Sequence, residues 1–379
     1  MIIIDTHQTD MNIIVAPDKF KGSIDAVTLC QIISKEVSAL HPEANVETFP
    51  LADGGDGFAA IIRHYFGTTE VKAKTVDPLG RPIVAMYQYA EETTTAYIEM
   101  AAASGLALLK EDEYDPLKAS TYGTGLLIRD AIARGAQKIV LGIGGSATND
   151  GGTGMADALG YMFLDKNEDP LIPCGEILTL INEIVMPETD YLEDIEFQVA
   201  CDVKNPFYGP DGAAFVYAPQ KGASEEDVNT LDEGLKHLDD LFIKFFSRSV
   251  AALPGAGAAG GLGGGCEVFL GARLIAGVDH IIEEVGLEKK IAKANIIITG
   301  EGCFDEQSLQ GKVVGTLARL AQKYNKRVRV ICGDSVLSDR DLGILGIESL
   351  VTLVSIAGDR LQSINEPRRF LKEAVKQSM

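Results

Sequence analysis

The feature that most constrains the fold is a recurring unit: a short apolar strand, a loop rich in Gly and Asp, and an amphipathic helix. Runs of Val and Ile between helices are typical of a parallel sheet that is covered on both faces. The pattern predicts an α/β protein with a three-layer architecture and a mostly parallel six-stranded sheet. The expected strands lie at residues 12–16, 45–52, 138–142, 295–299, 327–332 and 349–354.

Two stretches interrupt this pattern. Residues 75–115 alternate apolar and polar positions and are rich in Thr and Tyr, which predicts an antiparallel hairpin. Residues 163–284 are expected to hold a helix over 225–246, short strands at 196–201 and 213–219, and a Gly/Ala-rich loop, 254–265. We interpret the two stretches as a smaller second domain of α+β type. The composition of the Gly/Ala-rich loop fits either a flexible segment or one shaped around a ligand.

Charge and cysteine content limit the class of protein. The 379 residues include 34 Lys and Arg against 55 Asp and Glu, a net charge of −21. Such a chain should repel a phosphate backbone, so we expect no nucleic-acid partner. No apolar run is long enough to span a membrane, and residues 1–10 do not resemble a signal peptide. Because Met11 opens the first strand, residues 1–10 fit either an extension or a misplaced start. The scattered cysteines favour reduced thiols in the cytoplasm.

The polar, glycine-rich loops all follow predicted strands, so a parallel sheet would gather them along one edge. Residues 144–152, GGSATNDGG, expose successive N–H groups before a helix and suit an anion. The loop has neither the Lys of a Walker motif nor a GxGxxG pattern. Its candidate phosphate-binding residues are Gly144, Gly145, Ser146 and Asn149. Asp150 fits either an N-cap or a catalytic carboxylate.

The other strand-end loops add carboxylates, lysines and a hydroxyl. These residue types suit a triphosphate that is neutralised by Mg²⁺ and Lys. We expect Asp53, Glu301 and Asp305 near the metal, and Asp18, Ser23 and Lys312 at the substrate or the phosphates. Lys21, Asp150 and Asp202 are the catalytic candidates, although Asx-turns would also explain individual Asp residues.

With these residues assembled, the chain resembles the glycerate kinase type I family from about residue 11 to residue 370. The blocks that carry the resemblance are APDKFKGS (16–23), PLADGGDG (50–57), TYGTG (121–125), GIGGSATNDGG (142–152), CDVKNPFYGPDGA (201–213), GAAGGLGGG (257–265) and ITGEGCFDEQSLQGK (298–312). The family often has Ser at the position of Lys19 and Arg at that of Cys303. If that Arg contacts a ligand, Lys21 or Lys312 is expected to replace it here.

The resemblance implies a Rossmann-like domain, an inserted α/β domain and a cleft between them. We place the first domain at residues 1–75, 117–162 and 286–379, and the second at 76–116 and 163–285. The implied reaction is transfer of the γ-phosphate of ATP to a hydroxyl of D-glycerate, with Mg²⁺, giving 2-phosphoglycerate rather than 3-phosphoglycerate.

The resemblance also sets the expected roles. Phosphates would lie near residues 144–152 and Lys312, the glycerate carboxylate near Lys21 and Ser23, and Asp150 or Asp202 would accept the proton. A monomer or a homodimer is expected. Two alternatives stay open: a kinase for another small hydroxy acid, and a catalytically silent glycerate sensor. A nicotinamide-dependent oxidoreductase is disfavoured because GxGxxG does not follow the first strand.

Overall fold

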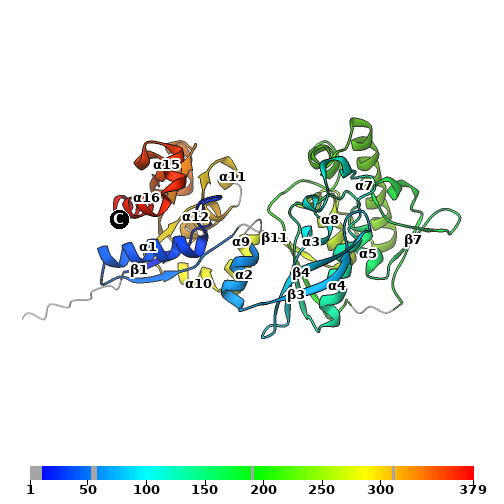
Figure 1. The fold of residues 1–379 in the computed structure, drawn as a ribbon, viewed down its shortest axis with the longest axis horizontal. Helices are drawn as coiled ribbons and strands as arrows, with labels where there is room; N and C mark the ends of the chain where they lie inside the picture. Colours follow the sequence, from blue (N-terminus) through cyan, green and yellow to red (C-terminus); the bar gives the residue numbers. More distant parts are fainter. Residues whose placement is uncertain (1–10, 53–57, 189–191, 310–311) are drawn as a thin grey trace, which may run out of the picture. The chain divides into compact units, whose positions relative to one another are not determined.

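The computed structural model describes residues 11–52, 58–188, 192–309 and 312–379 (Figure 1). The chain divides into two compact units. Unit 1 comprises Met1–Ile61 and Ala276–Met379, and unit 2 comprises Ile62–Ile275. Unit 2 is therefore inserted into the sequence of unit 1, and the helix α2 (Phe58–Phe66) spans the first boundary.

The sheet of unit 1 is entirely parallel, as the Val- and Ile-rich strands predict. Its described strands, from edge to edge, are β16 (Ile347–Thr352), β14 (Arg327–Cys332), β12 (Ile296–Thr299), β1 (Asn12–Val15) and β2 (Asn45–Thr48). The interior strand β1 places Ile14 opposite Ile297 of β12 on one side and Glu47 of β2 on the other. Ile14 and Ile297 are both buried, as expected for strands covered on two faces.

Helices cover both faces of this sheet. On one face, α1 (Ala26–Leu40) packs against α16 (Pro367–Ser378), and their apolar side chains join those of β1 and β12 in one core. On the other face, α12 (Val313–Lys323) contacts β12 and β14, with α9 (Gly277–Glu284) and α10 (Leu287–Ile291) beside it. The three-layer α/β architecture is thus confirmed. The remaining elements of the unit are β13 (Cys303–Phe304), α11 (Glu306–Leu309), β15 (Asp334–Ser335), α13 (Asp339–Leu345), α14 (Leu353–Ala357) and α15 (Arg360–Asn365).

Unit 2 is built on a mixed sheet. Its strands lie in the order β11 (Arg273–Ile275), β10 (Glu196–Ala200), β6 (Lys138–Gly142), β5 (Thr95–Glu99), β4 (Pro82–Ala90) and β3 (Thr69–Val76). Strands β3, β4 and β5 are antiparallel, which confirms the predicted hairpin, whereas β5, β6, β10 and β11 are parallel.

Helices and a small antiparallel sheet complete unit 2. The helices are α3 (Ala101–Ser104), α4 (Tyr122–Ala133), α5 (Thr153–Ala158), α6 (Ala213–Tyr217), α7 (Glu225–Phe246) and α8 (Leu262–Leu270), and the small sheet consists of β8 (Pro170–Leu171), β7 (Met162–Leu164) and β9 (Glu183–Val185). The helix α7 begins after a capping box, in which the Ser224 hydroxyl accepts from the backbone N–H of Asp227 and the Asp227 carboxylate accepts in return.

The organisation differs from the sequence expectation in three respects. The strand at residues 138–142 is β6 and pairs within unit 2, so the described sheet of unit 1 has five strands and not six. The unit boundaries differ from those expected for the same reason: the hairpin begins at Thr69 and β5 pairs with β6, which draws the stretch 117–162 into unit 2. Unit 2 is consequently the longer unit. The expected strand at 213–219 is the helix α6.

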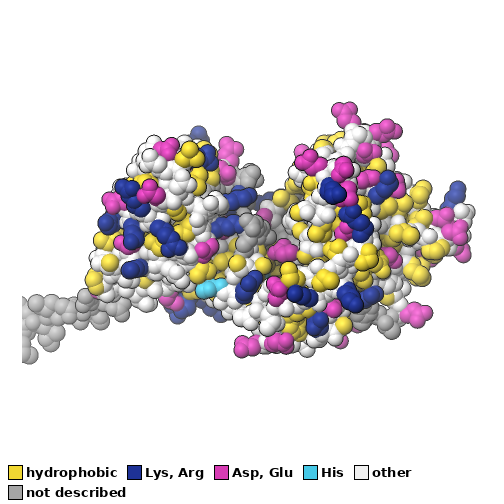
Figure 2. Space-filling model, in the orientation of Figure 1, with side chains coloured by type: hydrophobic (Ala, Val, Ile, Leu, Met, Phe, Trp, Pro, Cys, Tyr) yellow, Lys and Arg dark blue, Asp and Glu magenta, His cyan; other side chains and the backbone are white. Residues whose placement is uncertain are grey.

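The surface carries charges of both signs. Figure 2 shows Lys and Arg side chains interspersed with Asp and Glu on the visible face of each unit. None of the described helices combines the length and the apolar character that crossing a membrane requires.

Candidate active site

The sheet of unit 1 changes direction between β1 and β12. From β1 the chain proceeds to β2 at one edge, whereas from β12 it proceeds through β14 to β16 at the other edge. In open parallel sheets, such a switch point leaves a crevice beyond the carboxyl ends of the strands, and ligands bind there. The residues that follow β1 and β12 therefore flank the expected ligand site.

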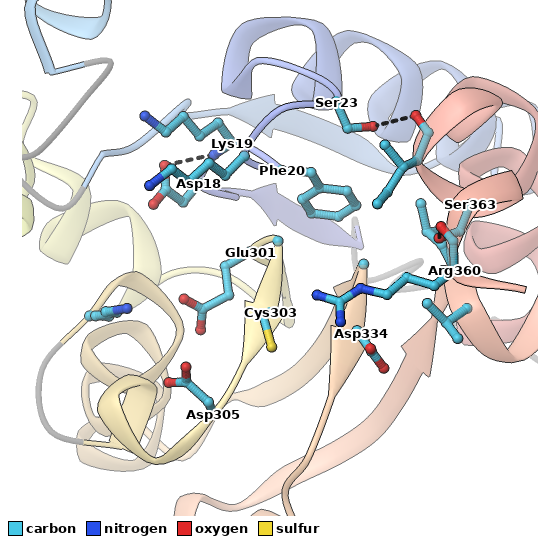
Figure 3. A pocket seen from close by; sticks show the side chains of 17 residues that line it. Asp18, Lys19, Phe20, Ser23, Glu301, Cys303, Asp305, Asp334, Arg360 and Ser363 are labelled. Carbon is cyan, nitrogen blue, oxygen red and sulfur yellow. Dashed lines mark hydrogen bonds between the residues drawn. The ribbon is translucent and has the colours of Figure 1, made fainter.

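A cavity of about 540 Å³ lies at this edge of the sheet (Figure 3). Loops after four neighbouring strands and the helix α15 line it. It brings together six of the residues singled out from the sequence: Asp18, Lys21, Ser23, Glu301, Asp305 and Lys312. The common position of their loops at strand ends explains why residues almost 300 positions apart in the sequence meet here.

Close backbone contacts fix the loops that carry these side chains. The backbone N–H of Asp18 donates to the carbonyl of Gly300 at 2.8 Å, which joins the loop after β1 to the loop after β12. A Cβ on Gly300 would lie far inside van der Waals contact with the carbonyl oxygen of Ile331. Only glycine allows the backbone after β12 to approach the end of β14 so closely.

Glu301 is the most buried of the described carboxylates that line the cavity. Its side chain is 5% exposed, and its Oε1 has no hydrogen-bond partner within the described part of the chain. Burial raises the pKa of Glu301 to about 7, against opposing effects from Ser308 and Lys312, while Asp18 and Asp305 raise it further. The charged form of Glu301 would therefore gain from a cation placed at Oε1.

The donor set around Glu301 fits Mg²⁺. Asp305 is held by Ser308, whose backbone N–H and hydroxyl both donate to Oδ1 of Asp305. Within the described ranges, no group of three or more His, Cys, Asp or Glu residues is arranged to hold a metal ion unaided. Mg²⁺ usually takes only one or two protein carboxylates, with water and substrate phosphates as its other ligands. Glu301 and Asp305 can supply these; Asp53, the third predicted ligand, lies outside the described residues.

Cationic side chains accompany the carboxylates. Lys312 immediately precedes α12, and its charge interacts with Glu301. The N-terminal end of α12 adds its own partial positive charge in this region. Lys21 is exposed in the loop after β1. Ser23, expected to bind substrate, instead donates its hydroxyl to the carbonyl of Ile364 on α15 at 3.1 Å.

The glycine-rich loop 144–152 belongs to unit 2 and is not part of this cavity. Gly144 is exposed, and Gly145 adopts a left-handed conformation with φ of 74°. The hydroxyl of Ser146 accepts a hydrogen bond of 2.7 Å from Nζ of Lys221, which also donates to the carbonyl of Thr148. Lys221 is 2% exposed, and burial lowers its pKa to about 7. The sequence did not indicate Lys221 as a site residue, because the segment PQKG (219–222) is typical of an ordinary turn.

Asp150 is completely buried at the end of the same loop. Its carboxylate accepts hydrogen bonds from the backbone N–H and hydroxyl of Thr121 and from the N–H groups of Gly152 and Gly154. Burial raises the pKa of Asp150, and the bonds from Thr121 and the glycines oppose that effect. In this arrangement Asp150 joins the loop to the start of α4 and α5.

The second glycine-rich segment, 254–265, packs directly on the loop 144–152. The N–H of Gly151 donates to the carbonyl of Gly260 at 3.0 Å. A Cβ on Gly265 would collide with the carbonyl of Gly151. The segment therefore has a defined conformation, and it packs against the loop 144–152. Its last residues form the start of α8. Asn149, 0% exposed between them, has side-chain atoms without a partner among the described residues.

Three further residues complete the comparison with the sequence expectation. Asp202 is exposed in the loop after β10 of unit 2 and is not among the residues that line the cavity of unit 1. Asp334 and Arg360 line the cavity but were not expected. The Gly-Asp pair after β14 was a usable signal for Asp334, since it ends a predicted strand, whereas nothing near Arg360 in the sequence marks a strand end.

The fold and the cavity define a two-unit α/β protein with a cavity, lined by charged and apolar side chains, at the switch point of a parallel sheet. Comparison with known proteins gives the family: the sequence model of the glycerate kinase family matches residues 13–379. The chain is 40% identical to a glycerate kinase of Halalkalibacterium halodurans over 93% of its length and 92% of that protein. It is also 40% identical to glycerate 2-kinase of Escherichia coli, with 92% of each chain covered.

A solved structure agrees with the sequence relatives. The crystal structure of a putative glycerate kinase 2 from Salmonella typhimurium LT2 superposes with a TM-score of 0.83 at 35% identity and covers 97% of this chain and 98% of that one. The protein therefore belongs to the glycerate kinase family, as the sequence motifs indicate.

Proposed function

We propose that the protein transfers the γ-phosphate of ATP to a hydroxyl of D-glycerate. The observation that carries the proposal is the cavity at the switch point, in a chain that belongs to this family. Its carboxylates and lysines are the groups that a metal–triphosphate requires. We propose 2-phosphoglycerate as the product, supported by the name of the Escherichia coli relative, glycerate 2-kinase.

The cavity suits the nucleotide better than the acceptor alone. Cavities of roughly 300–1,000 Å³ hold ligands much larger than a three-carbon acid, and this one encloses about 540 Å³. Lys21 and Lys312 supply positive charge for the phosphates, and the first turn of α12 adds N–H groups. Glu301 and Asp305 would hold Mg²⁺, which when bound neutralises phosphate charge.

The other predicted roles become more specific proposals. Phosphoryl transfer depends mainly on positioning and charge neutralisation, so a proton acceptor with a strongly shifted pKa is not required. Asp202 is exposed and stays a candidate for that role. Asp150 has its oxygens engaged by four donors, and we propose that it positions the loop 144–152 and does not accept the proton. We retain the proposal that this loop, through Gly144, Gly145, Ser146 and Asn149, contacts phosphate or substrate.

The test is an assay of the purified chain with ATP, Mg²⁺ and D-glycerate, with the two phosphoglycerates separated by chromatography. Glycerate-dependent release of ADP with 2-phosphoglycerate as product is the expected result. Formation of 3-phosphoglycerate would overturn the regiochemistry. Turnover with lactate or tartronate in place of glycerate would favour the alternative acceptor, and binding without turnover would favour a sensor.

We also propose a cytoplasmic location. All six cysteines are free, and burial raises the pKa of the thiols of Cys174 and Cys201 to about 11, which keeps them protonated and unreactive. Free thiols of this kind are typical of a reducing compartment. The choice between monomer and homodimer stays a prediction, to be decided by light scattering.

A further inference from the structure

The cavity of unit 1 has two chemically different ends. Glu301 and Asp305 point toward one another at one end, with Asp18 above them (Figure 3). At the other end Arg360, the first residue of α15, extends its guanidinium into the cavity beside Cys303 and Asp334 (Figure 3). Burial raises the pKa of the Cys303 thiol, Asp305 and Asp334 raise it further, and the positive charge of Arg360 opposes them.

The guanidinium of Arg360 is the positively charged group at this end of the cavity. It forms no ion pair and no hydrogen bond with any residue in the ranges that the structure describes, although Asp334 lines the same cavity. A guanidinium presents five donors in a planar fork, which matches the oxygens of phosphate or carboxylate. Its donors are therefore free for a ligand.

The segment that carries Arg360 is fixed in place. Asp359 caps α15 by accepting from the N–H of Gln362, and the hydroxyl of Ser363 donates to the carbonyl of Arg360 at 2.8 Å. The hydroxyl of Ser23 donates to the carbonyl of Ile364, which ties α15 to the loop after β1. These bonds hold the start of the Arg360 side chain at the rim of the cavity, so less entropy is lost when its head binds.

Apolar side chains surround this end of the cavity. Phe20 is 4% exposed and Leu353 1% exposed, and Val354 and Ile364 line the cavity with them. A base or ribose fits such a wall, whereas the three-carbon acid would leave it uncovered. The two ends of the cavity therefore differ in what they can bind. The end with Arg360 offers an apolar wall and one cation, whereas the end with Glu301 and Asp305 requires a metal ion before it can bind a phosphate.

We infer that Arg360 binds a phosphate of the ADP part of the nucleotide and thereby determines nucleotide affinity. This inference rests on the proposed kinase function. It assigns the apolar end of the cavity to the nucleoside and the carboxylate end to the metal and the transferred phosphate. Arg360 contacts substrate in this assignment and does not act through another residue.

The experiment compares Arg360→Gln, Arg360→Lys and the control Arg368→Gln. Arg368 is an exposed arginine on α16 that does not line the cavity. Calorimetry measures the Kd of ADP without Mg²⁺ and without glycerate, and steady-state kinetics give KM for ATP and for D-glycerate. Arg360→Gln is expected to raise the ADP Kd and the ATP KM about tenfold, because one charge-assisted interaction is lost. Arg360→Lys should recover part of this loss, and the glycerate KM should stay within twofold.

The outcomes separate the inference from the proposed function. If the unaltered enzyme shows no glycerate-dependent ADP release but ADP binding falls in Arg360→Gln, the nucleotide site stands and the acceptor was misassigned. If the unaltered enzyme turns over while Arg360→Gln behaves like Arg368→Gln, the role of Arg360 is overturned. A rise in the glycerate KM with unchanged ADP binding would also overturn it, since Arg360 would then hold the acid. Circular dichroism confirms that each variant is folded.

Discussion

Asp150 and Glu301 are both buried carboxylates, yet their surroundings give them different chemistry. Asp150 is surrounded by donors that belong to its own unit, so its charge is already compensated. Glu301 keeps an oxygen without a partner in the described structure and has acidic neighbours. A buried carboxylate with its donors in place stabilises the fold, whereas one without them favours an added cation.

Asp150→Asn is expected to destabilise the protein by about 2–4 kcal/mol, because the amide NH₂ faces donors that it cannot accept from. The free energy of unfolding, measured in urea, checks this. A variant with unchanged stability but greatly reduced kcat would instead make Asp150 the proton acceptor.

Glu301→Gln is expected to weaken binding of Mg²⁺–ADP about tenfold while ADP alone, in EDTA, binds as before. The reason is that an amide keeps the shape of the side chain but lacks the charge that the cation needs. Glu306→Gln, a neutralised exposed carboxylate on the neighbouring helix α11, is the matched control. Equal losses in the presence and absence of Mg²⁺ would remove Glu301 from the metal site.

At the scale of elements, the two glycine-rich segments of unit 2 form one packed feature. Neither segment alone shows this, because composition indicates only that the backbone approaches something closely. The partner is supplied by tertiary structure: Gly260 and Gly265 contact the backbone of the loop 144–152.

Gly265→Ala is expected to lower the free energy of unfolding by about 2–4 kcal/mol, the range found for overpacked or strained cores. Its added methyl group meets the carbonyl of Gly151, which is backbone and cannot rotate away. Gly343→Ala is the control, because a Cβ there meets nothing within 4 Å and the residue lies in the helix α13. Similar stability of both variants in thermal unfolding would contradict the packing.

Elements with strong local signals could be predicted from the sequence. The helix over 225–246 matches α7 residue for residue, because a capping box and an acidic first turn mark its start. The prediction of a strand at 213–219 was wrong, because residues 213–217 form the helix α6. Phe, Val and Tyr favour strands locally, but the burial of Ala213 and Ala214 in packed clusters stabilises a helix. The gathering of Asp18, Glu301 and Lys312 was predictable, since strand ends of a parallel sheet share an edge.

At the scale of the whole molecule, the assignment of strands to sheets could not be predicted. Residues 138–142 have the same Val- and Ile-rich character as the strands of unit 1, yet they pair with β5 and β10. Pairing partners are chosen over long separations: Asn12 bonds to Asn295, 283 positions away. The local sequence does not determine which strands pair. For the same reason, the boundaries of the two units differ from those expected from the sequence.

The stability of the whole molecule should depend on pH through Glu99 at the end of β5. Burial raises the pKa of Glu99 to about 7 from an ordinary value of 4.5. The folded state then binds more protons than the unfolded state between these values, so stability falls as pH rises from 4.5 through 7. Glu99→Gln removes this dependence, and its stability relative to the unaltered protein should rise by up to about 3 kcal/mol over the interval.

Urea unfolding at pH 5, 6, 7 and 8 measures this effect. Glu70→Gln on β3 serves as the control, because its side chain is exposed. Parallel stability curves for Glu99→Gln and the unaltered protein would show that the Glu99 carboxylate does not change its protonation on folding.

The insertion of unit 2 into the sequence of unit 1 has a consequence for synthesis on the ribosome. Strand β1 emerges early and can pair at once with β2, but its other neighbour, β12, follows only after Ile62–Ile275 has been made. At about 5–20 residues per second, that delay is roughly 10–40 s. The interior strand of the first unit therefore waits with an open apolar edge while the second unit folds. During translation the nascent chain thus presents a target for chaperones that the finished enzyme does not.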